Sequence, residues 1–236
     1  MELIKQLNVD EMRALMESDL LWREEEFIFF KNQLSNITDD NKKNTYRKSL
    51  VLILYSHLEG FIKTCLLTYI QYLNSLCIKN TEVVSGLKAS SLDQEFIKFN
   101  DKELHFKEIR NKDGTFDGVL DRFYRRVELI DGLDSMNSKQ LKLDDSVINT
   151  ESNLWYVVLQ KNLYKIGLPI NLFENNKNGI DALVNRRNTI AHGSMTAGIT
   201  EAEFSKWESN TKNIMTSILI TLFDYAKNKK YLKVEA

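Results

Sequence analysis

Apolar positions along this chain recur three and four residues apart, the spacing that puts side chains on one face of an α-helix. The segment from about Asp10 to Asn36 shows this pattern first, and three glutamates at 24–26 fall on its other side. Its apolar members are Leu20, Phe27, Phe30 and Leu34. The pattern predicts a first amphipathic helix.

A longer helix is predicted from Asp39-Asp40 to about Cys77. Its apolar positions are Val51, Leu54, Tyr55, Leu58, Ile62, Cys65, Leu66, Tyr69 and Leu73. They cover most of the helical circumference, which is typical of a helix at the centre of a bundle. The stretch Leu50–Tyr55 is too short to span a bilayer, and His57, Glu59 and Lys63 interrupt its continuation, so no membrane segment is expected.

Three more helices are predicted in the C-terminal part. One is capped by Ser152 and runs to Lys165, before Gly167 and Pro169 end it. The next begins near Asn178 and stops at Gly193. The last begins at the capping box Thr200-x-x-Glu203. Its apolar residues at helical spacing are Phe204, Trp207, Ile214, Ile218, Leu222 and Tyr225.

Residues 79–150 are less regular, and we interpret them as an insertion between core helices of a single all-α domain at 1–236. Ser91-x-x-Gln94 resembles a capping box, and 111–114 resembles a turn. The stretch Gly118–Ile130 is a candidate helix, and 134–149 is a candidate loop. Three arginines interleave with aromatic residues in that helix, at 122, 125 and 126, which suits either RNA binding or a solvated helix face.

Composition narrows the function classes. The formal net charge is −1, so any RNA contact has to come from a local basic patch. The chain has one proline among abundant helix formers, which favours long helices. Cys65 and Cys77 fit neither a redox pair nor a zinc site and are expected to be reduced core thiols. With no signal-peptide pattern after Met1, a cytoplasmic protein is expected.

The run from Asn185 to Gly193 carries the chemistry. It brings Arg187, Asn188 and His192 within six residues, in a chain with only three histidines. Asn188 and His192 are four apart and share a helix face, so the amide is predicted to steer the imidazole. Arg187 is long enough to reach the same phosphate. Gly193 is the predicted left-handed cap, and a helix C-terminus favours a protonated imidazole.

These groups match RNA cleavage that uses the 2′-hydroxyl as nucleophile. An arginine stabilises the phosphorane charge, and a histidine transfers a proton. One imidazole serves one end of the reaction at a time, so a two-fold homodimer with two facing motifs is the mechanistic expectation. No cluster of His, Asp and Glu has metal-ligand spacing, and we predict no metal and no other cofactor.

The segment from Leu183 to Gly193 resembles the signature of the HEPN superfamily (higher eukaryotes and prokaryotes nucleotide-binding), Arg-x4-His with a polar residue after the arginine. The upstream helix from Tyr55 to Lys63, with its Leu-Glu-Gly-Phe run, resembles a second element of the bacterial MAE_28990/MAE_18760 and RiboL-PSP-HEPN groups. Together the two elements cover about a quarter of the chain.

This resemblance implies an all-α HEPN-like bundle, a homodimer and a metal-independent endoribonuclease of a toxin–antitoxin, abortive-infection or other antiviral system. An RNA substrate is implied, and so is an antitoxin or other partner protein of such a system. The catalytic residues carried over are Arg187, Asn188 and His192. Glu59 is a supporting candidate that could orient Arg187, and Arg186 is a neighbour that could contact phosphate.

Two other readings remain open at this point. The same dimer could be a non-catalytic module that binds nucleotide, RNA or a partner protein, with His192 a helix-capping residue and Arg187 in an ordinary ion pair. A HEPN toxin could also be silenced by nucleotide transfer from an antitoxin, for which Tyr225 and Tyr231 are candidate acceptors. His57 and His105 are expected to be ordinary polar side chains.

Overall fold

The structure is a computed structural model, and it describes residues 6–233. Its regular elements in that range are helices, apart from two isolated β-bridges, Lys79 to Gln140 and Val83 to Leu232. The helices are α1 (Val9–Asn32), α2 (Asp40–Ser75), α3 (Ser85–Ser91), α4 (Asp93–Asn100), α5 (Gly118–Ser138), α6 (Tyr156–Lys165), α7 (Lys177–Ala191) and α8 (Glu201–Lys227). Short 3-10 turns lie at Gln33–Asn36, Asp145–Val147 and Glu174–Asn176. The all-α prediction is confirmed.

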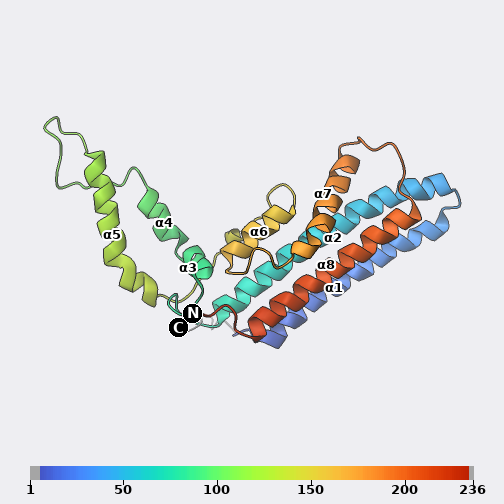
Figure 1. Cartoon of the computed structure of the whole chain (residues 1–236), viewed down its shortest axis with the longest axis horizontal. Coiled ribbons are helices and arrows are strands. Elements are labelled where there is room, and N and C mark those ends of the chain that lie inside the picture. The colour runs from blue at the N-terminus through green and yellow to red at the C-terminus, as the bar shows by residue number, and fades with distance from the viewer. Residues whose placement is uncertain (1–5, 234–236) are drawn as a thin grey trace.

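An elongated bundle of α1, α2 and α8 forms the main body, and α7 packs against α2 and α8 (Figure 1). The helix α2 supplies most of the core, with fully buried Leu50, Phe61, Ile62 and Tyr69. By length and composition α2 alone in residues 6–233 could cross a membrane, but 56% of its apolar window is buried inside the bundle. Its hydrophobicity is therefore the one expected of a core helix.

Helix ends follow the sequence signals in most places. The capping box at Thr200 and Glu203 forms as predicted, and Asp39 caps α2 through the amide of Lys42. The cap predicted at Ser152 is wrong. The helix α6 begins at Tyr156, whose amide donates to the carboxylate of Asp181 on α7, 2.8 Å away. A side chain distant in sequence thus takes the role of the local cap.

The inserted segment is more helical than its sequence suggests. The helix α5 continues to Ser138, eight residues past the predicted end, and α3 and α4 precede it. The turn at 111–114 is present, with Gly114 at φ +83°. The capping box at Ser91 is wrong, because α4 begins at Asp93 without a side-chain cap and the hydroxyl of Ser91 accepts from Lys142 instead.

The two cysteines differ in environment. Cys65 is fully buried in α2, as predicted. Cys77 is exposed, just after the end of α2, in a left-handed conformation with φ +56°. The prediction of a second core thiol is therefore wrong, because α2 ends at Ser75 before its apolar face would reach position 77.

Candidate active site

The motif occupies the C-terminal end of α7, and its glycine ends the helix. Gly193 has φ +71°, its amide donates to the carbonyl of Ile190, and the amide of Ser194 donates to the carbonyl of Thr189. This pair of hydrogen bonds is a Schellman motif, which satisfies carbonyls that the end of a helix would otherwise leave free. The predicted left-handed cap is confirmed, and it fixes the backbone of His192 as the residue that caps α7.

The imidazole of His192 is exposed and forms no hydrogen bond within residues 6–233. Its backbone amide donates to the carbonyl of Asn188, 2.9 Å away. The side chain is thus held only through the backbone, at the C-terminal end of α7. It is free to accept or donate a proton to a molecule that reaches this surface.

Arg187 is held more firmly. Its Nη1 atom donates to the Oδ1 of Asn188 at 2.8 Å and to the Oδ1 of Asn153 at 3.0 Å. Its guanidinium lies over the ring of Tyr55 on α2, 5.0 Å from the ring centre, in cation–π geometry. Within residues 6–233 the Nη2 and Nε atoms make no hydrogen bond, so these donors remain available to an anion.

Asn188 therefore acts differently from the sequence prediction. Sequence spacing paired its amide with the imidazole of His192, whereas in the structure its side-chain oxygen accepts from Arg187. The two residues share a helix face as predicted, but the contact between them is through the backbone. Asn188 is a positioning group for the guanidinium in this structure.

Glu59 reaches the motif indirectly. No ion pair joins Glu59 to Arg187 in the described part of the chain. The carboxylate instead lies next to the hydroxyl of Tyr55: burial, with the hydrogen bond and charge of Glu59, raises the pKa of Tyr55 to about 12, against the opposing effects of the Leu154 amide and Arg187. Tyr55 thus stays neutral, and its hydroxyl accepts a hydrogen bond from the amide of Leu154 at 2.9 Å.

Three members of the Leu-Glu-Gly-Phe run of α2 have a packing explanation. Leu58 and Phe61 are core residues. Gly60 lies against the guanidinium of Arg23 on α1, and a Cβ at position 60 would be 2.6 Å from its Nη1 atom. The run therefore packs against α1 through Gly60, while Tyr55, one turn earlier on α2, lies against Arg187 of α7.

Arg186 points away from Arg187. Its Nη1 lies 3.5 Å from the sulfur of Met195, and its Nη2 lies 3.9 Å from a carboxylate oxygen of Glu203. It lines a polar groove between α7 and α8. Lys48 of α2 binds the carbonyls of Met195 and Thr196, at 2.7 and 3.1 Å, and so fixes the loop that follows the motif.

Sequence reasoning missed Asn153 altogether. It lies 34 positions before Arg187, in the irregular stretch before α6, and nothing in its local sequence marks it. The hydrogen bond from the Tyr156 amide to Asp181 brings this stretch against α7. Only the tertiary arrangement makes the contact visible.

The other candidates are also placed. Tyr231 is buried, and burial raises the pKa of its hydroxyl above the usual range, while Tyr225 is half-buried with Lys230 over its ring. His57 is buried against Trp22, and burial lowers its pKa. In residues 6–233 no group of three or more His, Cys, Asp or Glu side chains could hold a metal ion.

Comparison with known proteins gives one match. The model of the HEPN_MAE_28990/-like HEPN family matches residues 12–231, which is nearly the whole chain. Searches of curated proteins and of solved structures found no match. The match includes both elements on which the resemblance was based, the Arg-x4-His motif of α7 and the Leu-Glu-Gly-Phe run of α2. The chain therefore belongs to the HEPN_MAE_28990/-like HEPN family.

Proposed function

We propose that this protein is a metal-independent endoribonuclease with Arg187 and His192 as its catalytic residues and Asn188 as the positioning group beside them. One observation carries the proposal. A guanidinium is anchored through a single nitrogen and keeps its other donors free, close in sequence to an exposed imidazole at a helix end. In an ordinary structural ion pair, the paired N–H donors of the arginine guanidinium would instead be bound to a carboxylate.

The chemistry follows from these groups. The ribose 2′-hydroxyl attacks the adjacent phosphorus, the 5′-oxygen leaves, and a 2′,3′-cyclic phosphate and a 5′-hydroxyl result. The free nitrogens of Arg187 neutralise charge that develops on the non-bridging oxygens. His192 takes the proton from the 2′-hydroxyl or gives one to the leaving oxygen. Tyr55 is neutral and buried, and its ring packs against the Arg187 guanidinium without competing with it for the anion.

We expect purified protein to cleave single-stranded or loop RNA in excess EDTA, because the proposed charge stabilisation comes from a guanidinium rather than from a metal held by carboxylates. The measurement is the cleavage rate with and without chelator, together with the chemistry of the new ends. A 5′-hydroxyl and a cyclic or 3′-phosphate are expected. Activity that EDTA abolishes and Mg²⁺ restores contradicts the proposal, as do 5′-phosphate ends.

A cellular role in a toxin–antitoxin, abortive-infection or antiviral system is part of the proposal. Its support is family membership together with the intact Arg-x4-His motif. Growth arrest when the chain is expressed in bacteria, absent with the His192→Ala form, is the matching cellular observation. A binding module that uses the same surface would arrest growth equally in both forms or in neither.

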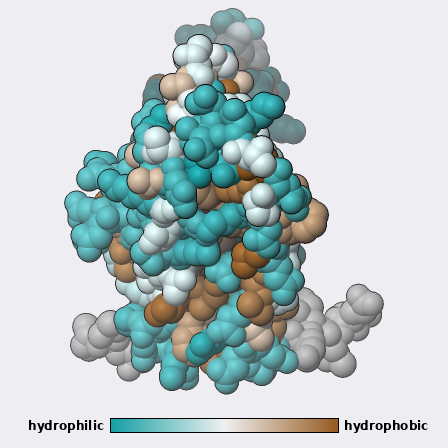
Figure 2. Space-filling model, turned by 90° about the vertical axis from the view of Figure 1, so that its right-hand side faces the viewer, coloured by the Kyte–Doolittle hydropathy of each residue, from teal (hydrophilic) through white to brown (hydrophobic). Residues whose placement is uncertain are grey.

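We also propose a two-fold homodimer with both motifs lining one cleft. Each chain offers one exposed motif imidazole, and in-line transfer benefits from groups at both the attacking and the leaving oxygen. The bundle has apolar surface to support association: α1 exposes Leu15, Leu21, Trp22, Ile28 and Phe29. Seen from the right-hand end, apolar side chains gather low on the surface among hydrophilic ones (Figure 2).

Light scattering at micromolar concentration is expected to give about twice the chain mass of 27.5 kDa. Specific activity should fall on dilution below the dissociation constant, because a site that needs two chains is lost with the dimer. A monomer that keeps full nuclease activity at every concentration would refute the composite site. It would leave the catalytic assignment of Arg187 and His192 untouched.

A further inference from the structure

A polar groove between α7 and α8 lies next to the motif, on the side that Arg186 faces. The two helices run in opposite directions along it. Gly179 of α7 lies against Asn210 of α8, and nearer the motif the Nη2 of Arg186 lies 3.9 Å from a carboxylate oxygen of Glu203. The groove has a volume of about 660 Å³, within the range of pockets that hold small organic ligands. It is therefore large enough for a nucleotide.

Side-chain amides line much of this groove, and their hydrogen-bonding groups are free. They belong to Asn175, Asn178, Asn210 and Asn213. None of the four forms a side-chain hydrogen bond within residues 6–233, although Asn210 is half-buried. A Cβ at Gly179 would be 2.2 Å from the Nδ2 of Asn210, so glycine there leaves room for this amide. Each amide offers donors and an acceptor, as the edge of a nucleobase does.

Trp207 of α8 adds an aromatic ring to the same groove. It is half-buried, because one part of the side chain packs against the hydrophobic core. Within the described residues no other aromatic ring stacks on it, and its indole N–H has no hydrogen-bond partner. An aromatic ring beside unpaired amides suits a ligand with a flat π-system and polar edges, and a nucleobase has both.

The charges of the groove favour an anionic ligand. Arg186 and Lys206 outnumber Glu203, so the lining carries a net charge of +1. Glu203 is engaged in the cap of α8, where its Oε2 accepts from the amide and the hydroxyl of Thr200 at 2.9 and 2.8 Å. Its contact with Arg186 is long, and Lys206 is exposed with no ion pair in residues 6–233. Both cations are thus available to a phosphate.

The groove and the candidate catalytic groups lie along one helix. Arg186 is six residues before His192, which is about 9 Å along the axis of α7. In helical projection Asn178 and His192 are about 40° apart, so the rim of the groove and the imidazole lie on the same side of α7. Stacked nucleotides at about 3.4 Å per step cover 9 Å in about three steps. One RNA strand can therefore reach both places.

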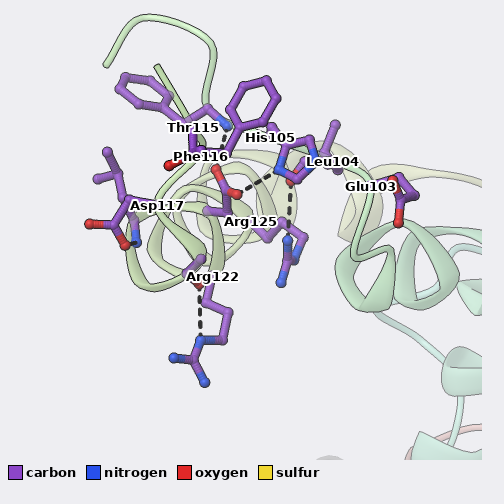
Figure 3. A network of polar contacts seen from close by, with 12 residues as sticks. Glu103, Leu104, His105, Thr115, Phe116, Asp117, Arg122 and Arg125 are labelled. Atoms are coloured by element: carbon purple, nitrogen blue, oxygen red, sulfur yellow. Dashed lines mark hydrogen bonds and ion pairs between the residues drawn. The ribbon is translucent and has the colours of Figure 1, made fainter. Parts of the chain in front are cut away.

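The arginine-rich helix α5 is the other basic surface of the chain, and two of its three arginines have partners there. Figure 3 shows Arg125 donating to the carbonyl of Leu104, at 3.1 Å, while the Nε of Arg122 donates to a carbonyl of its own helix at 3.2 Å. Beside them, Asp121 accepts from the Nδ1 of His105 at 2.6 Å. Arg125 is thus a structural residue, and the groove is the better-suited place for RNA.

We propose that the groove between α7 and α8 binds one nucleotide of the RNA substrate, within about three nucleotides of the scissile phosphate. Its base stacks on Trp207, the asparagine amides bind its polar edge, and Arg186 and Lys206 bind its phosphate. The choice of RNA rests on the proposed function, which this site extends to substrate binding. A protein segment is a less suitable occupant, because protein interfaces have an apolar centre and this lining is mostly polar.

Indole fluorescence tests the stacking directly. The chain has three tryptophans, Trp22, Trp155 and Trp207. The probe is a single-stranded RNA oligonucleotide with 2′-fluoro riboses, which lacks the nucleophile for cleavage. Binding should quench the fluorescence of the parental chain, because a stacked base quenches an indole. Trp207→Phe should lose this quenching and still bind, whereas Trp22→Phe, which alters an exposed tryptophan on α1, should keep it.

Affinity measures what the ring contributes. Trp207→Leu keeps an apolar side chain against the core but has no aromatic face, so it should weaken binding of the same oligonucleotide by about tenfold. Trp207→Phe should retain most of the affinity. With cleavable RNA, Trp207→Leu should raise the half-saturating concentration by a similar factor and leave the single-turnover rate at saturation unchanged, because the contact is equal in ground and transition states.

Salt dependence tests the two cations. Arg186→Ala and Lys206→Ala should each make the plot of log affinity against log salt concentration shallower by about 0.7, because one phosphate contact is lost. Lys63→Ala, at an exposed lysine of α2, is the matched control and should leave the slope unchanged. A purely structural role for Arg186 or Lys206 would alter the melting temperature and not this slope.

Quenching that persists in Trp207→Phe would overturn the proposal, and so would a slope that falls as much in Lys63→Ala as in Lys206→Ala. If Trp207→Leu changes the mass measured by light scattering while RNA affinity is unaltered, the groove is a contact between chains and the proposal is wrong. The binding measurements use an uncleavable strand. Groove binding without any cleavage by the parental chain would refute the nuclease and keep this site, whereas chelator-resistant cleavage unaffected by Trp207→Leu would refute the site alone.

Discussion

The substitution His192→Ala is expected to lower the RNA cleavage rate by about 10²–10⁴-fold, the usual effect of removing a proton-transfer group. The imidazole is exposed and bonded to nothing within residues 6–233, so its removal leaves no buried group without a partner. The melting temperature should therefore hardly change, since exposed substitutions of this kind alter stability by about 0.5 kcal/mol or less. Single-turnover cleavage of a defined oligonucleotide, with thermal unfolding alongside, is the measurement.

Two further variants distinguish proton transfer from a structural role. His192→Gln keeps a polar side chain of similar reach but cannot exchange a proton near neutral pH, and it should be as inactive as His192→Ala. Asn185→Ala, at an exposed position three residues before Asn188 on α7, should cut RNA at the unaltered rate. Parental activity in either His192 variant shows that another group moves the proton.

The helical core was predictable because its information is local. Apolar spacing in α1, α2 and α8, the capping box of Thr200 and Glu203, and the left-handed Gly193 each depend on residues within a few positions of one another. The caps predicted at Ser91 and Ser152 failed for the opposite reason. At Ser152, the carboxylate of Asp181 on α7 accepts from the Tyr156 amide in place of a local cap. At Ser91, the hydroxyl accepts from the distant amide of Lys142, and α4 begins without a side-chain cap.

In the candidate site, too, the features set by local sequence were predictable and the contacts with distant residues were not. The Arg-x4-His spacing and the helix end are sequence features, so Arg187 and His192 could be selected before the fold was known. The groups that hold Arg187 could not all be found, because Asn153 and Tyr55 lie 34 and 132 positions away. Wheel geometry also misassigned the amide of Asn188, because it compares directions on one helix and ignores the reach of a long adjacent side chain.

Arg187 is held in place by Asn188, Asn153 and Tyr55, and its substitution is the second one expected to lower the cleavage rate strongly. Arg187→Ala should reduce cleavage by about 10²–10³-fold, because a preorganised donor aimed at developing charge is lost. Arg187→Lys keeps the charge but not the planar fork. An ammonium cannot donate to Asn188 and Asn153 while also presenting a second pair of donors to phosphate, so most of the loss should remain.

Asn153→Ala tests how much the positioning of the Arg187 guanidinium contributes, because it removes one hydrogen bond to this group and leaves its charge in place. It removes one acceptor of the Nη1 atom and leaves the Asn188 contact and the Tyr55 ring, so the guanidinium stays near the site with less restraint. We expect about a tenfold fall in the single-turnover rate, the order of effect of losing one hydrogen bond to a charged group. In the Asn153→Ala variant, affinity for an oligonucleotide with a 2′-deoxy residue at the cleavage position should change little.

Arg187→Ala, by contrast, should weaken that affinity as well as the rate, because a phosphate contact is lost in the ground state. If Arg187→Ala cuts RNA at the parental rate while Asn153→Ala does not, the stretch before α6 binds substrate itself, and the guanidinium is only its support.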